Sequence, residues 1–135
     1  LLEDGRRVLL ETSGTLGHDK LLPLAEVPAG VHRIVDLKAP GSGIPAGLID
    51  WAGIAELGPE DELKFVLAGR EDYEWAREIV RREGHLPKEP TVSFSPVEAT
   101  LPGRDLAEWI LADRLDVRFQ IQLHRAVWPD VDRGV

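Results

Sequence analysis

Cysteine and methionine are both absent from this chain of 135 residues. Without cysteine, the chain cannot build a disulfide, a thiolate zinc site, a cysteine nucleophile or the ligands of an iron–sulfur cluster from its own residues. The absence of cysteine also fits a cytoplasmic protein, which is the location we expect. The sequence begins at Leu1 and has no initiator methionine, so we expect a fragment or a processed product. No charged-then-apolar leader opens the sequence, and no signal peptide is expected.

Long hydrophobic runs and a basic surface are lacking as well. The longest uncharged apolar runs have about five residues, whereas a membrane span needs roughly 20. Asp and Glu number 24 against 16 Lys and Arg, and the formal net charge of −8 argues against a nucleic-acid coat. The chain is nevertheless 43% hydrophobic, which is too apolar for a disordered tail. We expect a single β/α domain over residues 1–135 that binds neither nucleic acid nor membrane.

Short segments rich in β-branched and apolar residues alternate with segments of helical periodicity. Strands are predicted at residues 7–12, 32–38, 63–68, 91–97 and 117–124. Helical segments are predicted at residues 48–57, 71–84 and 105–113, and a short turn or helix at residues 18–26. This rhythm indicates βαβ units around a parallel sheet. It fits either a doubly wound open sheet or a piece of a (β/α) barrel, and both gather ligand chemistry at the carboxyl ends of their strands.

Polar residues gather where the predicted strands end. Glu11 follows two leucines, and it is either a half-exposed carboxylate or an acceptor for paired N–H donors on the edge of a heterocycle. Asp36 and Lys38 lie two residues apart and therefore share one face of their strand. They form either an ion pair that adds little stability or a hydroxyl acceptor beside a carboxylate partner. A ribose and an amino-acid group would need the second arrangement.

The last predicted strand alternates strictly between apolar and polar residues. The apolar face carries Val117, Phe119, Ile121 and Leu123, and the polar face carries Arg118, Gln120, Gln122 and His124. One interpretation is an edge strand with a solvated face. The other is a polar row that faces a ligand, with His124 at its end as a hydrogen-bond donor or an acid–base group.

The glycine-rich stretch 41–47 lacks the dinucleotide-binding spacing. It reads G-x-G-x-x-x-G with Pro45 inside, so we predict a flexible turn at which the backbone approaches a ligand. No P-loop, nucleophile elbow, zinc-protease or kinase signature occurs. The four histidines lack the spacing of metal ligands, so no metal site is predicted within this chain. No residue of this chain is assigned as catalytic.

Taken in order, these segments resemble the C-terminal part of the 7-carboxy-7-deazaguanine synthase family. The likeness runs through E-T-S-G-T at 11–15, D-L-K-A-P-G-S-G at 36–43, G-P-E-D-E-L-K-F-V at 58–66, S-F-S-P-V at 93–97, L-A-E-W-I-L at 106–111, Q-I-Q-L-H-R-A-V-W-P at 120–129 and R-G-V at 133–135. Each motif is weak by itself. The ordered series covers nearly the whole chain and is more specific.

The resemblance implies an α/β fold with a parallel sheet that forms the later part of an incomplete (β/α) barrel of the radical S-adenosylmethionine type. It implies a lyase of queuosine and deazapurine biosynthesis, which contracts the ring of 6-carboxytetrahydropterin to 7-carboxy-7-deazaguanine with loss of ammonia. The implied cofactors are S-adenosylmethionine, Mg²⁺ and a [4Fe–4S] cluster. The cluster ligands of the family belong to the half before Leu1, outside this chain. We therefore expect the fragment to be inactive alone, to bind its N-terminal half and to form a homodimer.

The resemblance also implies roles for individual residues. Glu11 and Thr12 would bind the pterin substrate, Glu11 at its amino edge. His124 and Arg133 would contact the same substrate from the last strand and the tail. The S-adenosylmethionine site would contain Asp36 at a ribose hydroxyl, where the family also uses Ser, together with Lys38, and Ser95 where other members have Gln near the adenine.

A second hypothesis comes from a different functional class. The chain could be a β/α module that binds a ligand or partner and has no chemistry of its own. Three closely spaced cysteines on a loop before Leu1 in the full gene would decide for the enzyme. A start codon just upstream would favour the binding module.

Overall fold

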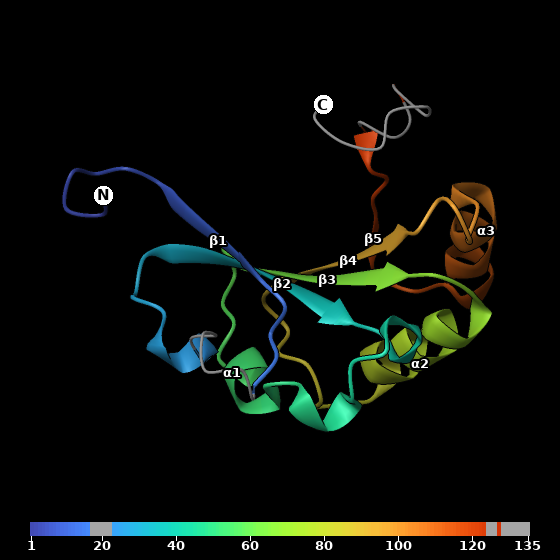
Figure 1. Cartoon of the computed structure of the whole chain (residues 1–135), viewed down its shortest axis with the longest axis horizontal. Helices are drawn as coiled ribbons and strands as arrows, with labels where there is room; N and C mark the ends of the chain where they lie inside the picture. Colours follow the sequence, from blue (N-terminus) through green and yellow to red (C-terminus); the bar gives the residue numbers. More distant parts are fainter. Residues whose placement is uncertain (17–22, 124–126, 128–135) are drawn as a thin grey trace.

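The computed structural model describes residues 1–16, 23–123 and 127 of the chain (Figure 1). Within these residues, five strands form one sheet in the order β1-β2-β3-β4-β5. The strands are β1 (Val8–Thr12), β2 (Val31–Lys38), β3 (Glu62–Leu67), β4 (Thr91–Pro96) and β5 (Arg118–Phe119). Every neighbouring pair is parallel. The parallel sheet predicted from the sequence is confirmed.

The connections between the strands carry the helices. The α-helices are α1 (Trp51–Ala55), α2 (Arg70–Arg81) and α3 (Gly103–Asp113), and the short 3₁₀ turns are η1 (Leu24–Glu26), η2 (Pro40–Ser42) and η3 (Ala46–Leu48). Asp50 is the N-cap of α1, and its side chain accepts a hydrogen bond from the Gly53 amide. The second helix stops three residues before Gly84, where the sequence had predicted its end.

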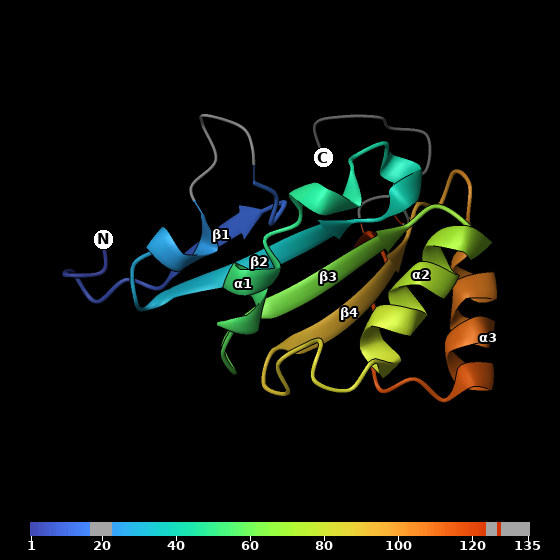
Figure 2. The same cartoon turned by 90° about the horizontal axis from the view of Figure 1, so that it is seen from below.

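The helices lie on one side of the sheet. Helices α1 and α2 cover one face, and α3 extends this layer beyond β4 (Figure 2). None of the described helices covers the opposite face. A doubly wound sheet has helices on both faces and a reversal of strand order, whereas this sheet keeps chain order throughout. Of the two architectures that the sequence allowed, the arrangement has the features of a (β/α) barrel segment.

The hydrophobic core lies between the sheet and this helical layer. Leu63, Phe65 and Leu67 alternate along β3 and are fully buried beneath α2, which contributes Tyr73 and Ala76. A buried aromatic or leucine side chain contributes about 1.5–3 kcal/mol through removal of apolar surface from water. The periodicity of residues 71–84 thus predicts the buried stripe of α2 correctly.

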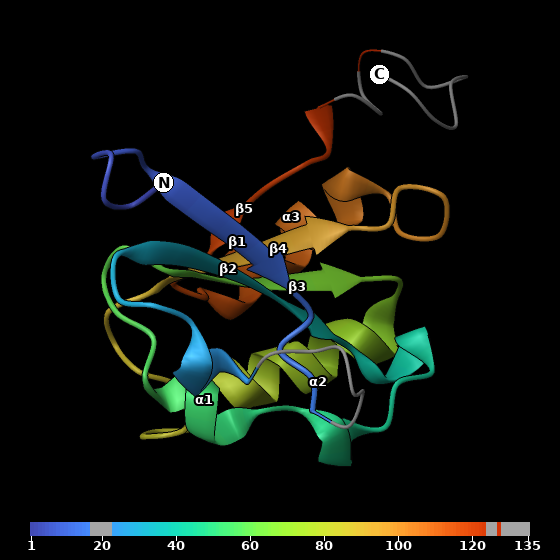
Figure 3. The ribbon, with the colours of Figure 1, turned by 60° about the vertical axis from the view of Figure 1, so that its left-hand side comes forward.

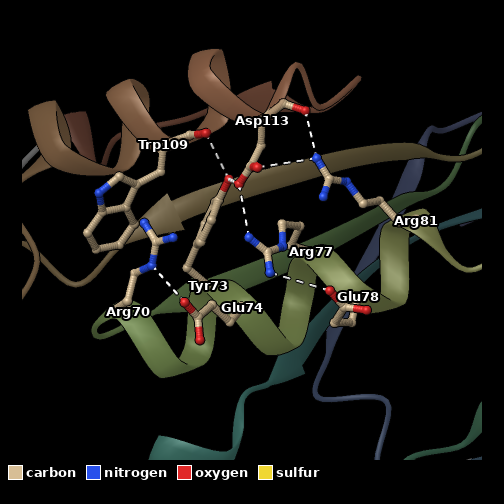
Figure 4. A network of polar contacts seen from close by, with 8 residues as sticks. All are labelled: Arg70, Tyr73, Glu74, Arg77, Glu78, Arg81, Trp109 and Asp113. Carbon is tan, nitrogen blue, oxygen red and sulfur yellow. Dashed lines mark hydrogen bonds and ion pairs between the residues drawn. The ribbon is translucent and has the colours of Figure 1, made fainter.

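A polar network joins α2 and α3 where the two helices face each other (Figure 4). The Tyr73 hydroxyl lies 2.6 Å from Asp113 Oδ2 and 2.9 Å from the Trp109 carbonyl oxygen. Arg77 and Arg81 both donate to the Asp113 carboxylate, at 3.3 Å and 3.2 Å. Burial and the hydrogen bond to Asp113 raise the pKa of Tyr73 to about 12. The same hydrogen bond and the two arginines hold the pKa of Asp113 below its usual range.

The prediction of a strand through residues 117–124 is wrong for residues 120–123, and His124 lies outside the described residues. Strand β5 has two residues, and its last bond to β4 runs from the Gln120 amide to the Phe94 carbonyl at 2.9 Å. The next bond of a parallel ladder would need an N–H donor at residue 96, and Pro96 has none. The alternation of polar and apolar residues therefore continues past the point where pairing stops.

The described part of the chain contains no helix that combines the length and the apolar character needed to cross a membrane.

Candidate functional site

The face of the sheet away from the helices carries the polar residues of the strand ends. Residues paired across parallel strands point to the same face, and neighbours along a strand point to opposite faces. Asp36 pairs with Lys64, and Lys64 pairs with Ser93. Their neighbours Leu37 and Phe65 are fully buried on the helical side. The row Asp36, Lys64 and Ser93 therefore lies on the open face, and Glu11, Lys38 and Ser95 share that face by the same alternation.

A polar hollow of ≈ 230 Å³ lies on this face at the ends of β1 and β2. It is lined by Glu11, Thr12, Ser13, Ile34, Asp36, Lys38 and Lys64. Two carboxylates and two ammonium groups surround it, so the lining can accept hydrogen bonds from hydroxyl or amino groups and donate them to a carboxylate. The structure brings together Glu11, Asp36 and Lys38, which the sequence had singled out separately.

Asp36 uses only one of its two carboxylate oxygens within the described residues. Lys38 Nζ donates to Asp36 Oδ2 at 2.5 Å. Asp36 Oδ1 is buried and has no hydrogen-bond partner among the described residues. A buried carboxylate oxygen without a partner is costly, because it has lost water without gaining a protein donor. The free oxygen is thus suited to a hydroxyl or amino donor of a bound ligand.

Ser95 presents a second polar atom without a partner on the same face. It is 1% exposed, and its Oγ has no hydrogen-bond partner among the described residues. Ser95 pairs with Val66, which in turn pairs with Lys38, so Ser95 is two strand spacings, about 10 Å, from Lys38. Ser95 thus shares the face that carries Asp36 but does not line the hollow.

Two predicted site residues lie outside the described residues, and one lies at the rim. His124 and Arg133 fall in the part of the chain that the structure does not describe. Thr12 lines the hollow, but its side chain alternates away from the face that carries Glu11. Its hydroxyl accepts a long hydrogen bond of 3.4 Å from the Gly14 amide and supports the turn after β1.

Lys64 is the charged lining residue that was not predicted from the sequence. It lies opposite Asp36 in the register, yet it makes no ion pair within the described part of the chain. The site residues predicted from the sequence lie at strand ends, whereas Lys64 is in the middle of β3. The signal was present, because Glu62, Lys64 and Val66 alternate with the buried Leu63, Phe65 and Leu67.

A second hollow, of ≈ 730 Å³, lies near the amino ends of β2 and β3. Its main charged groups are already paired with each other. Arg33 Nη2 lies 2.6 Å from Asp61 Oδ2, and Asp61 also accepts from the amides of Arg33 and Gly58. Burial raises the pKa of Asp61, but these hydrogen bonds outweigh it and hold the pKa below its usual value. The Arg33–Asp61 pair therefore fits a structural role better than ligand binding.

The residues present can hold some of the implied cofactors but not others. Partnerless Asp36 Oδ1 and Ser95 Oγ fit a ligand with hydroxyl and amino groups, such as S-adenosylmethionine. The chain has no cysteine for an iron–sulfur cluster. Among the described residues, no three His, Asp or Glu side chains are placed to hold a metal ion. Any ligands of a cluster would have to come from outside this chain.

Comparison with known proteins supports the family resemblance. The chain is 40% identical over its whole length to the 7-carboxy-7-deazaguanine synthase of Koribacter versatilis and covers 62% of that protein. It is 42% identical over 95% of its length to the synthase of Chlorobaculum tepidum and covers 56% of it. The synthase of Methanospirillum hungatei is 28% identical over 94% of the chain, which covers 49% of that protein.

The resemblance predicted from the motifs is therefore confirmed, and the chain spans about half to three-fifths of the length of these relatives. The names of these relatives are those of enzymes. No family model matches the chain, and no solved structure matches it.

Proposed function

We propose that this chain is the C-terminal part of a 7-carboxy-7-deazaguanine synthase and forms one wall of its ligand-binding site. The observation that carries the proposal is the match at 40% identity along the whole chain. The structure adds a second observation, because Glu11 of β1 and Asp36 and Lys38 of β2 line the same hollow. Such a cluster of polar side chains is what a ligand-binding site needs. In this proposal the sheet is the later part of an incomplete (β/α) barrel, and its open face is the lumen.

S-adenosylmethionine would bind toward β2 and β4. Asp36 Oδ1 would accept a hydrogen bond from a ribose hydroxyl, since it is the oxygen that Lys38 leaves free. The Lys38 ammonium would lie beside the carboxylate of the amino-acid group. Ser95 Oγ would bond to the adenine or ribose. In this chain these residues bind and orient the cofactor.

The pterin substrate would bind toward β1. Glu11 is an exposed carboxylate at the rim of the hollow, and its two oxygens match the paired N–H donors of a pterin amino edge. Thr12 would line the same end of the pocket. His124 and Arg133 would complete the substrate site from the end of the chain.

The chemistry would depend on groups held elsewhere in the full protein. A reduced [4Fe–4S] cluster, with ligands outside this chain, would supply the electron that cleaves S-adenosylmethionine, and Mg²⁺ would assist at the substrate. The overall reaction is a carbon–nitrogen lyase reaction that yields 7-carboxy-7-deazaguanine and ammonia. The part of the reaction that falls to this chain is to hold the pterin and the nucleoside against each other and exclude water from between them.

The remainder of the enzyme would meet this chain at the edge of β1. Strand β1 lies at the outer edge of the sheet (Figure 3), where it pairs with β2 on one side. Leu9 on this strand is 58% exposed, which is unusual for a large apolar residue in a sheet. An apolar edge strand favours pairing with another strand. We propose that the preceding half of the barrel, or a second copy of the chain, covers it.

The test is conversion of 6-carboxytetrahydropterin by the full-length protein that carries this chain, purified with its cluster and supplied with S-adenosylmethionine and a reductant. The proposal predicts 7-carboxy-7-deazaguanine and stoichiometric ammonia, and it predicts loss of turnover on replacement of Lys38 by Ala. Binding of a ligand without turnover by the reconstituted protein would instead support the non-catalytic module.

A further inference from the structure

Asp72 joins two loops at the carboxyl end of the sheet. Its side chain is 5% exposed, and each carboxylate oxygen accepts a hydrogen bond from a different backbone segment. Oδ2 accepts from the Ala68 amide at 2.9 Å, immediately after β3. Oδ1 accepts from the Gly41 amide at 3.0 Å, three residues after Lys38 at the end of β2.

The position of Asp72 in α2 accounts for the first of these bonds. Asp72 is in the first turn of the helix, which begins at Arg70. An acidic side chain at this position commonly reaches back to an amide before the helix and also interacts favourably with the positive end of the helix dipole. The second bond goes further than a helix cap requires, because Gly41 is 31 residues away in sequence. Asp72 is therefore both a cap of α2 and a clamp on the loop after β2.

Gly41 is fitted to this clamp. A Cβ atom built on Gly41 would lie 2.8 Å from Asp72 Oδ1 and 3.0 Å from Oδ2. The sequence had predicted that the backbone of the glycine-rich stretch approaches a ligand. At Gly41 the structure shows that the close approach is to Asp72.

We propose that Asp72 is a positioning residue for S-adenosylmethionine binding, an inference that rests on the proposed function. By holding the Gly41 amide, it fixes the loop 39–43 that immediately follows Lys38. The Lys38 ammonium donates to Asp36 Oδ2, and this contact sets the direction in which the unpaired Oδ1 points. The orientation of Oδ1 therefore depends on a fixed backbone at the end of β2. Asp72 does not touch the hollow and acts through the loop.

The test compares Asp72→Asn with a matched variant, Asp50→Asn. Asp50 is 6% exposed and likewise accepts two backbone amides, from Gly53 at 2.9 Å and Leu24 at 3.1 Å, but it does not line the polar hollow. In each variant one oxygen becomes an amide nitrogen, which cannot accept an N–H bond. Both variants should lose comparable stability toward urea. Asp72→Asn should raise the dissociation constant of S-adenosylmethionine about tenfold in the full-length protein, because without the clamp the loop after Lys38 adopts its binding geometry only part of the time.

Binding of the pterin should change less than about twofold in Asp72→Asn, and Asp50→Asn should leave S-adenosylmethionine binding within the same range. Equal weakening by both variants, or wild-type affinity in Asp72→Asn, would overturn the inference. If Asp72→Asn does not fold, Gly41→Ala presses on the same contact from the loop side. Its control is Gly47→Ala, because a Cβ at Gly47 has no atom within 4 Å. Gly41→Ala should weaken binding and Gly47→Ala should not.

S-adenosylmethionine binding by the unmodified protein separates the failure of the proposed function from the failure of the role of Asp72. If it binds no S-adenosylmethionine, the proposed function is wrong and the role of Asp72 in cofactor binding is wrong with it. If it binds and the variants do not differ, only the role of Asp72 is wrong. Amide hydrogen exchange without ligand tests directly whether Asp72 holds the loop. The amides of residues 39–43 should exchange faster in Asp72→Asn than in the wild type, and their exchange rates should not change in Asp50→Asn.

Discussion

Lys38 Nζ donates to Asp36 Oδ2 at 2.5 Å, while Oδ1 of the same carboxylate is buried without a partner among the described residues. The lysine therefore neutralises the carboxylate and fixes its orientation without using all of its hydrogen-bonding capacity. A pair that served stability alone would leave no buried oxygen unsatisfied. The relationship between these two residues is the main structural reason to regard the hollow as a binding site.

The helical layer depends on the Tyr73 hydroxyl. Replacing Tyr73 by Phe removes the donor to Asp113 and to the Trp109 carbonyl while it keeps the buried ring. We expect the free energy of unfolding to fall by about 1–3 kcal/mol, because the hydroxyl of a fully buried side chain and its hydrogen bonds are lost. Urea unfolding followed by tryptophan fluorescence measures this. Arg104→Ala, which removes an exposed ion pair with Glu108, is the control and should change stability little. Equal effects of the two variants would contradict the account.

Tyr73 also provides a pH probe, since it is the only tyrosine of the chain. Its pKa is raised to about 12 in the folded state from an ordinary value of 10.0. The folded state therefore favours the protonated hydroxyl, and this stabilisation is present below pH 10 and is lost as the pH rises toward 12. Spectrophotometric titration of the native chain should show tyrosinate forming well above pH 10, and the urea-unfolded chain should titrate near 10. Coincident curves would show that the network of Figure 4 does not form.

Acid should weaken the fold through Asp61. The pKa of Asp61 in the folded state is below the ordinary 3.8, which means that the fold stabilises the ionised carboxylate relative to the protonated one. The stabilisation is present above pH 3.8 and is lost as the pH falls through the lower folded value. Asp61→Asn should be less stable than the wild type at pH 7, and the difference should shrink below pH 3.8. The exposed Asp116→Asn is the control. A stability difference that does not depend on pH would argue against the ionised Arg33–Asp61 pair.

The sequence predicted the sheet well because its strands are governed by local alternation. Leu63, Phe65 and Leu67 alternate with polar residues in the sequence and are buried in the structure. Glu11, Asp36 and Lys38 could be predicted to meet because parallel strands bring their carboxyl ends to one edge. The end of β5 could not be predicted from its own residues, since it is set by the absence of an N–H at Pro96 on the neighbouring strand.

The contact between Gly41 and Asp72 was also beyond prediction. The glycine signalled a close backbone approach, but nothing in the local pattern named the partner 31 residues away. Asp72 resembles an ordinary acidic residue in the first turn of a helix. Long-range clamps of this kind are visible only when the loop and the helix are placed together.

The edge of β1 predicts self-association of the 135-residue chain. Leu9 is exposed on this edge strand, and pairing would satisfy the free backbone groups of β1. Size-exclusion chromatography with light scattering should show dimers or larger species of the chain alone. Leu9→Lys should reduce their fraction, and Leu111→Lys, at a 76% exposed leucine of α3, should not. A stable monomer that is unaffected by adding the N-terminal half would argue that β1 is not an interface.

The most direct test of the central claim is a crossed binding titration of the full-length protein. Calorimetry would measure 6-carboxytetrahydropterin and S-adenosylmethionine against Glu11→Gln and Asp36→Asn. Both substitutions keep the side chain's size and remove its charge. We expect Glu11→Gln to weaken pterin binding about tenfold to a hundredfold and Asp36→Asn to weaken S-adenosylmethionine binding by a similar factor, since each loses charge-assisted bonds. Each variant should bind the other ligand within about twofold of the wild type. Unchanged affinity for both ligands in both variants would contradict the assignment of this hollow as the binding site.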